Sequence, residues 1–127
     1  VKCHSAANLT DVPPTLLDLA GLKVPAAMQG RSLASCLDGR KTDGGFSFSE
    51  RVTSGARHVR RVAPGAKGSF MARGEGWKYC RYSDGQEYLY DLRQDPGEMK
   101  NLAGHKQTAV MARVLDQWLE QTGWPRS

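Results

Sequence analysis

Apolar and polar positions change their spacing along the chain, and each spacing predicts an element. Residues 46–50 alternate apolar and polar side chains, as a strand with one buried face does. Residues 69–73, 77–82 and 87–92 predict three further strands, because short glycine-containing turns separate them. Residues 106–121 carry apolar side chains at helical spacing. The apolar stripe of this helix comprises Val110, Met111, Val114, Leu115, Trp118 and Leu119.

These elements predict an α+β fold, in which an antiparallel sheet of about four strands packs against a long C-terminal helix. Trp77 and Tyr79 are two residues apart, so they lie on the same face of their strand. Tyr90 occupies the next strand, so we expect the two strands to bury a shared aromatic layer.

Prolines and glycines mark where the elements begin and end. The residue before a proline avoids helical backbone angles, so we expect Pro13 to lie outside the first helix and Pro14 to begin it. Gly21 can adopt the left-handed conformation that ends the helix. After the last strand, Pro96 predicts a turn in which Gly97 takes a positive φ.

The predicted helix at residues 14–20 is too short to be stable alone. Its apolar surface is formed by Leu16, Leu17 and Leu19. Little else in the chain is patterned to cover these leucines, so we expect self-association through them when no other domain is present. A second short helix is predicted within residues 32–39, between a serine cap and a closing glycine.

Basic residues gather in residues 51–67, where no regular pattern holds. One interpretation is a solvated surface loop; the other is a loop that contacts an anionic substrate, because arginine forks match sulfate and carboxylate oxygens. The candidate anion contacts are Arg57, His58, Arg60 and Arg61. No aromatic residues are interleaved with them, and no nucleic-acid-binding motif is present, so we expect no nucleic-acid partner.

Charge and cysteine content exclude few classes of protein. The chain has 18 Lys and Arg against 13 Asp and Glu, a formal net charge of +5. Cys3, Cys36 and Cys80 are odd in number and lack metal-ligand spacing, so we expect buried apolar thiols instead of a disulfide framework or a zinc site. No apolar run approaches the roughly 20 residues of a membrane span, and no signal peptide is evident.

Several short blocks, in this order, resemble the C-terminal third of sulfatases, within the alkaline-phosphatase-like superfamily. They are TDVPPTLLDLAG at 10–21, GRSL at 30–33, SE at 49–50, WKY at 77–79, LYDL at 89–92, DPGE at 95–98 and NL at 101–102. The resemblance implies that residues 1–30 are the last helical segment of an α/β catalytic domain. Residues 31–43 are then a connector with a short helix, and residues 44–127 the C-terminal subdomain.

The family's chemistry implies a calcium ion and a formylglycine made within Cys/Ser-x-Pro-x-Arg. No cysteine here begins that motif: Cys36 has an arginine at the right offset but Asp38 where proline is required. The sequence also has no carboxylate cluster resembling the calcium ligands, and the histidines have no ligand spacing. We therefore assign no catalytic residue, no metal ligand and no cofactor to this chain, and predict it to be inactive alone.

The resemblance further implies structural motif residues, which we expect to serve architecture more than catalysis. They are Asp11, Pro14, Gly21, Trp77, Tyr79, Tyr90, Asp91, Asp95, Pro96, Gly97, Asn101 and Trp118. The implied partners are the catalytic domain and a sulfated small molecule or glycan, with no membrane partner. A periplasmic or secreted location is usual for bacterial members. Two alternatives stay open: the tail of a phosphonate or phosphate ester hydrolase, or a stand-alone basic polyanion-binding module.

Overall fold

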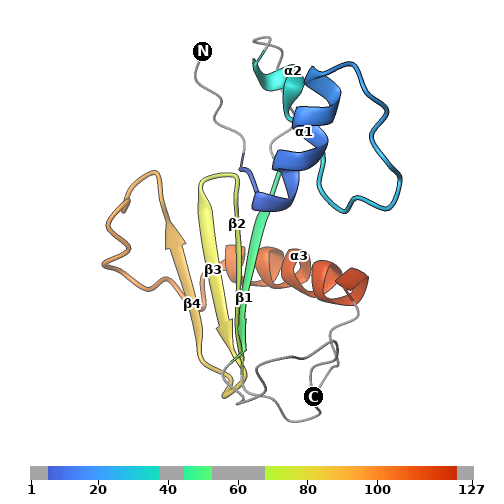
Figure 1. Ribbon diagram of the computed structural model, residues 1–127. Coiled ribbons are helices and arrows are strands. Elements are labelled where there is room, and N and C mark those ends of the chain that lie inside the picture. The colour runs from blue at the N-terminus through green and yellow to red at the C-terminus, as the bar shows by residue number, and fades with distance from the viewer. Residues whose placement is uncertain (1–5, 38–44, 53–67, 123–127) are drawn as a thin grey trace. The chain divides into compact units, whose positions relative to one another are not determined.

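The computed structural model describes residues 6–37, 45–52 and 68–122. The chain divides into two compact units, Val1–Ser47 and Phe48–Ser127 (Figure 1). None of the helices in the described ranges is both long and apolar enough to cross a membrane. Assignment of residues 1–30 to a separate catalytic domain stays a prediction.

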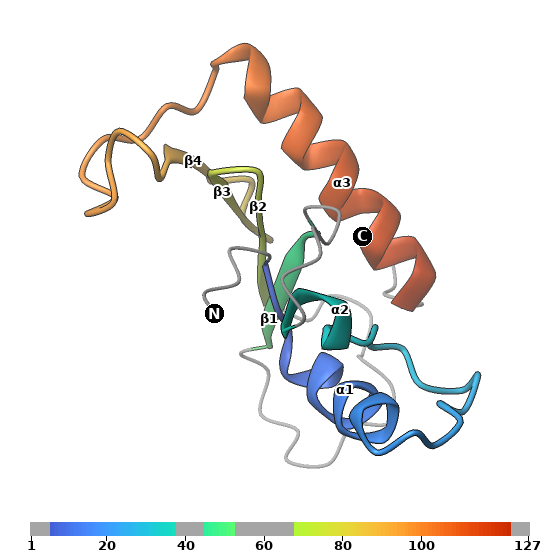
Figure 2. The same cartoon turned by 90° about the horizontal axis from the view of Figure 1, so that it is seen from above.

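The first unit contains a 3-10 helix, η1 (Leu9–Asp11), which leads directly into α1 (Val12–Leu19), and a short α2 (Ala34–Leu37). Figure 2 shows α2 beside α1, and the two helices contact each other. Helix α1 begins earlier than expected, and Pro13 lies inside it. The first turn of a helix needs no backbone N–H, so two consecutive prolines are accommodated there. Gly21 has the expected positive φ, 69°.

The second unit is built on a four-stranded antiparallel sheet in the order β1-β2-β3-β4, as expected. The strands are β1 (Ser47–Val52), β2 (Gly68–Gly74), β3 (Trp77–Tyr82) and β4 (Glu87–Asp91). Glu75 and Gly76 form the turn between β2 and β3, with φ angles of 52° and 80°. Two successive positive φ angles match the twist of the flanking strands, so this turn fixes the hairpin register.

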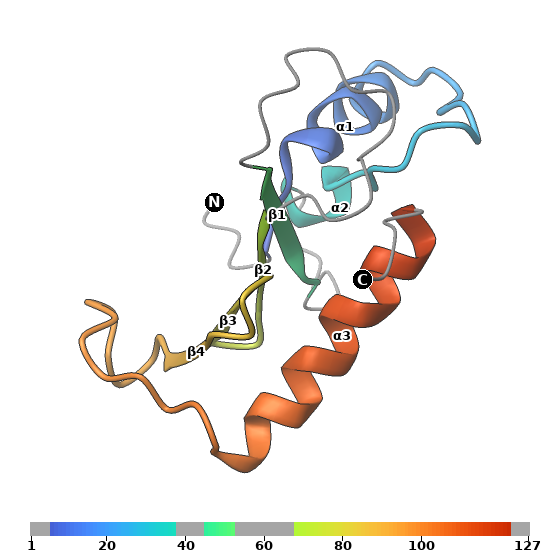
Figure 3. The same ribbon diagram turned by 90° about the horizontal axis from the view of Figure 1, so that it is seen from below.

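Helix α3 (Lys106–Thr122) covers one face of the sheet (Figure 3). Alternate residues of β2 point toward it, and Met111, Leu115 and Leu119 are its buried side chains. Val110 is 46% exposed, so its expected place in the buried stripe is wrong. The side chains buried between sheet and helix are Phe70, Ala72, Tyr79, Leu89, Met111, Leu115 and Leu119.

The expected aromatic layer between β3 and β4 is wrong. Tyr79 pairs with Leu89 across the two strands, whereas Tyr90 pairs with Lys78. Paired residues lie on the same face of an antiparallel sheet, so Tyr79 faces α3 and Tyr90 faces away from it. The register places Tyr90 one residue out of phase with the expected layer.

Candidate functional site

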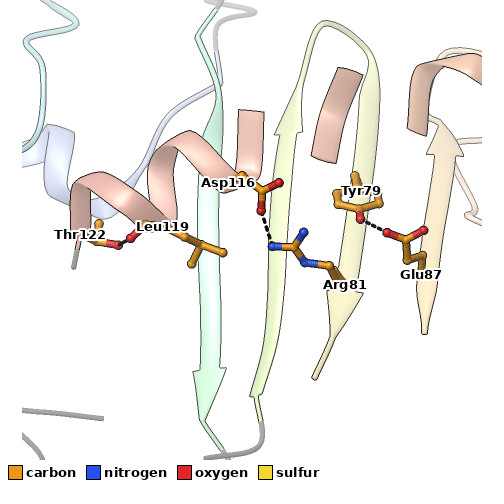
Figure 4. Close-up of polar contacts among 6 residues, drawn as sticks. All are labelled: Tyr79, Arg81, Glu87, Asp116, Leu119 and Thr122. Atoms are coloured by element: carbon orange, nitrogen blue, oxygen red, sulfur yellow. Dashed lines mark hydrogen bonds and ion pairs between the residues drawn. The ribbon is translucent and has the colours of Figure 1, made fainter. Parts of the chain in front are cut away.

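Two polar pairs lie on the face of the sheet toward α3 (Figure 4). Arg81 of β3 donates from Nη2 to Oδ1 of Asp116 in α3 over 2.6 Å. Burial lowers the pKa of Arg81, but the hydrogen bond and charge of Asp116 outweigh it, so the net shift is upward. The guanidinium therefore stays charged and ties the helix to the sheet.

The second pair joins the two strands under the helix. The hydroxyl of Tyr79 donates to the carboxylate of Glu87. Burial, followed by the hydrogen bond and the charge of Glu87, raises the pKa of Tyr79 well above its ordinary value. A phenol held neutral beside a carboxylate is a hydrogen-bond donor at every physiological pH, which suits a structural role.

The sequence analysis did not single out Arg81, Glu87 or Asp116. Arg81 and Glu87 stand opposite each other across β3 and β4, and opposite charges at paired positions stabilise a sheet. That signal becomes visible only when the hairpin register is known.

The segment after β4 is held by side-chain acceptors. Oδ2 of Asp95 accepts the amide of Lys100 over 2.8 Å. Backbone donors at Lys100, then Met99 and Glu98, lower the pKa of Asp95 below its usual value. The positive φ of this turn is at Glu98, 56°, and not at Gly97 as expected. Here the carboxylate of Asp95, and not a glycine, organises the turn.

Asn101 connects this segment to β4. Its Oδ1 accepts the amides of Leu89 over 3.0 Å and Ala103 over 2.9 Å. Its Nδ2 donates to the carbonyl of Glu87 over 3.1 Å. The backbone amide of Leu102 also donates to the carbonyl of Leu89 over 2.8 Å. A side-chain amide thus satisfies both a donor and an acceptor of the strand backbone.

The remaining motif residues of the second unit lie near the ends of these elements. Trp77 stacks on His105, with ring centroids 5.6 Å apart, just before α3 begins. Asp91 accepts the amide of Arg93 over 3.0 Å in the turn after β4. Pro96 is an exposed residue of the following turn.

In the first unit, Asp11 is a buried carboxylate. Its two oxygens accept the amides of Asn8 over 2.8 Å and Arg31 over 3.0 Å. Next to it, Gly30 packs so closely that an added Cβ would lie 1.8 Å from the carbonyl oxygen of Thr10. Asp11 therefore fixes the returning chain against the start of α1, where Pro14 is also buried.

The cysteines differ from expectation. Cys36 is disulfide-bonded, and its partner lies outside the described residues. The expectation of a free thiol is wrong there, because pairing depends on how close the fold brings two cysteines, which spacing along the chain does not reveal. Cys80 is free, and burial raises its thiol pKa.

The candidate anion contacts Arg57, His58, Arg60 and Arg61 lie outside the described residues. Within residues 6–37, 45–52 and 68–122, no group of three or more His, Cys, Asp or Glu side chains could hold a metal ion. On α1, Leu16 is 61% and Leu19 53% exposed, whereas Leu17 is partly buried. The described site residues therefore serve packing and hydrogen bonding within the fold.

Comparison with known families gives a match over almost the whole chain. The family described as N-sulphoglucosamine sulphohydrolase, C-terminal, matches residues 3–123. The Delta 4,5-hexuronate-2-O-sulfatase of Bacteroides thetaiotaomicron is 43% identical over 88% of this chain and 23% of its own length. Arylsulfatase K of Mus musculus is 33% identical over 81% of this chain and 19% of its own length. The chain thus spans only about a fifth of these relatives.

Solved structures agree with the sequence relatives. A 2-O GAG sulfatase superposes with a TM-score of 0.68 and 34% identity, over 90% of this chain and 25% of that protein. A phosphonate monoester hydrolase from Silicibacter pomeroyi superposes with a TM-score of 0.61 and 30% identity, over 87% of this chain and 24% of its own. The same architecture therefore occurs in enzymes of both chemistries.

Proposed function

Because the chain belongs to the N-sulphoglucosamine sulphohydrolase C-terminal family, we propose that it completes a sulfatase acting on a sulfated sugar, whose catalytic domain precedes it. The observation that carries the proposal is the 43% identity to a hexuronate-2-O-sulfatase over 88% of the chain. A 2-O-sulfated hexuronate is accordingly the substrate class to test first.

The described residues of the chain have a structural role in such an enzyme. The hydrogen bond of Arg81 joins the sheet to the helix, that of Tyr79 joins β3 to β4, and those of Asn101 join β4 to the segment that follows it. The described residues do not fit a metal ion, so a calcium ion and a formylglycine, if the whole enzyme uses them, would be held by the catalytic domain. When bound there, they would supply the nucleophile and charge stabilisation for sulfate-ester cleavage.

The basic stretch at residues 51–67 would shape the substrate pocket. Its arginines can each donate two parallel hydrogen bonds to a sulfate or carboxylate group. The net charge of +5 favours approach of an anionic sugar. In this proposal Arg57, His58, Arg60 and Arg61 contribute to substrate binding and not to bond cleavage.

A periplasmic or extracellular location fits this function. The disulfide at Cys36 supports it, because disulfides persist in oxidising compartments. Localisation of a tagged full-length protein after cell fractionation tests this part of the proposal.

The activity is tested by comparing the chain alone with the longer protein that includes its catalytic domain. Both are incubated with an unsaturated 2-O-sulfated hexuronate disaccharide, an aryl sulfate and a phosphonate monoester, and released sulfate or phosphonate is measured. We expect sulfate release by the longer protein only. Sulfate release by the chain alone contradicts its assignment as a non-catalytic part, and preference for the phosphonate ester supports the alternative hydrolase chemistry.

Substitutions in residues 51–67 test the proposed substrate contacts of the basic stretch. Arg57→Ala and Arg60→Ala in the longer protein should raise KM for the disaccharide about tenfold and leave kcat within about twofold, as loss of uniform binding does. Lys106→Ala, an exposed lysine at the start of α3, is the matched control. Unchanged KM in both arginine variants would reject the substrate role.

Self-association is a separate proposal for the chain without its catalytic domain. The exposed surfaces of Leu16 and Leu19, next to Leu17, would pair two copies. Light scattering of the chain and of a Leu16→Ser/Leu19→Ser variant tests it, and a monomer in both cases argues against it.

A further inference from the structure

The sheet face opposite α3 has an unusual composition for a surface. We call it the open face, and it comprises Ser69, Met71 and Arg73 of β2, Lys78, Cys80 and Tyr82 of β3, and Tyr88 and Tyr90 of β4. All eight are partly or fully exposed. Met71, Cys80 and Tyr88 form one row across three strands, since Cys80 pairs with both of the others.

Three side chains of the open face make contacts that the structure describes. Tyr82 and Tyr88 meet edge to face, with ring centroids 5.7 Å apart. The ammonium of Lys78 is bonded to a carboxylate oxygen of Glu98 over 2.5 Å. The charge of Lys78 is thus partly neutralised beside a centre of methionine, cysteine and tyrosine, and methionine and tyrosine are enriched where proteins contact each other.

The outer face of α3 differs sharply from the open face. Its exposed residues include Arg113, Gln117, Glu120 and Gln121. In a helix with one apolar and one polar face, the polar face is typically exposed to solvent. The open face instead has methionine, cysteine and tyrosine at its centre, with Arg73 and Lys78 beside them. Of the two outer surfaces of this layer pair, the open face is the one patterned to be covered.

We propose that the open face is the surface through which the chain docks on the catalytic domain of its full-length sulfatase; this rests on the proposed function. The relatives devote about three-quarters or more of their length to the part that this chain does not match, since the chain covers 23% and 19% of two of them. That part is large enough to cover a sheet face of three strands. The tyrosine hydroxyls allow such a contact to stay partly polar, as interdomain contacts within one chain are.

Cys80 reports on this contact without any substitution, because it is free and lies in the middle of the open face. The chain alone and the longer protein are treated with N-ethylmaleimide under non-reducing conditions, and labelling of Cys80 is followed by peptide mass spectrometry. We expect labelling at least about tenfold slower in the longer protein, because a docked face must open before the thiol reacts. A cysteine introduced by Gln117→Cys, on the outer face of α3, should label at equal rates in both.

Each outcome separates the docking proposal from the proposed function. Equal labelling of Cys80 in a longer protein that releases sulfate overturns the docking face and leaves the function intact. Protection only in the longer protein supports the docking face, whatever ester that protein hydrolyses.

A substitution gives an independent measurement. Tyr88→Lys places a charge in the open face, while Arg113→Ser changes the outer face of α3. Tyr88→Lys should lower the Tm of the longer protein by several degrees and shift that of the chain alone by less, whereas Arg113→Ser should shift neither. Equal shifts in both proteins would mean that Tyr88 serves only the fold of the sheet.

Discussion

The indole of Trp118 in α3 lies parallel to the ring of Phe48 in β1, with centroids 4.9 Å apart and an angle of 3° between the planes. Both residues belong to the second compact unit. This stack attaches the first strand of the sheet to the C-terminal half of the helix. The buried core itself is centred on β2, β3 and β4, and the stack adds a contact of β1 with α3.

Removing the indole should therefore destabilise the sheet–helix pair. We expect Trp118→Ala to lower the free energy of unfolding by about 2–4 kcal/mol, because a large aromatic contact and its stacking are lost together. Gln117→Ala, at the exposed neighbouring position, should change it by less than about 0.5 kcal/mol. Urea titration monitored by circular dichroism measures both, and equal effects of the two substitutions would contradict the role of the stack.

The buried Asp11 gives a prediction for the first unit. Asp11→Ala leaves the amides of Asn8 and Arg31 without their acceptor, which should cost about 1–3 kcal/mol locally. Hydrogen exchange at these two amides should then be about tenfold faster or more. Asp18→Ala removes only an exposed acceptor of Ser32 and is the control. Unchanged exchange at Arg31 in Asp11→Ala would show that the carboxylate does not hold the returning chain.

The raised pKa of Tyr79 predicts how stability depends on alkaline pH. The unfolded chain releases the phenol proton near pH 10, whereas the folded chain keeps it, so the unfolded state gains stability as pH rises above about 10. Tyr79→Phe should therefore reduce the loss of stability between pH 8 and pH 11. Tyr82→Phe is the matched control, since Tyr82 is exposed on the other face of the same strand. Denaturant titrations at the two pH values decide it: an alkaline loss of equal size in wild type and Tyr79→Phe refutes the prediction.

Substitutions of Asn101 can separate the contribution of its side-chain donor to stability from that of its side-chain acceptor. Asn101→Asp keeps the acceptor for Leu89 but loses the donor to the carbonyl of Glu87, whereas Asn101→Ala loses both. We expect losses of about 1–3 kcal/mol for alanine and less for aspartate at neutral pH. Thermal melts of the two variants, with exposed Gln94→Ala as control, measure the order. A larger loss for aspartate than for alanine would mean that its added charge outweighs the retained acceptor.

The layer architecture was predictable from sequence because its signals are local. Alternation, glycine turns and one amphipathic stripe define β2 to β4 and α3 to within about two residues. The face of Tyr90 was not predictable, because it depends on which residue of β3 stands opposite it. The positive φ at Glu98 depends on three backbone donors converging on Asp95. No pair of residues in the sequence indicates that arrangement.

The candidate site was less predictable than the fold. The polar clasps arise from residues that are distant in sequence, such as Arg81 and Asp116, which are 35 positions apart. The disulfide at Cys36 likewise depends on tertiary proximity. The expectation for Arg57, His58, Arg60 and Arg61 stays a prediction, since those residues lie outside the described ranges.

The hydrogen bonds that Asn101 and its neighbours make with β4 have a consequence for how the protein behaves at high concentration. β4 is the last strand of the sheet, and its outward backbone groups would otherwise be a template for another chain. The amide and carbonyl of Leu89, the carbonyl of Glu87 and the carbonyl of Asp91 are all occupied from within the same molecule. Strand-by-strand growth of sheets from one molecule to the next is thereby blocked on this side, and a chain that loses the amide of Asn101 is the one expected to form fibrils.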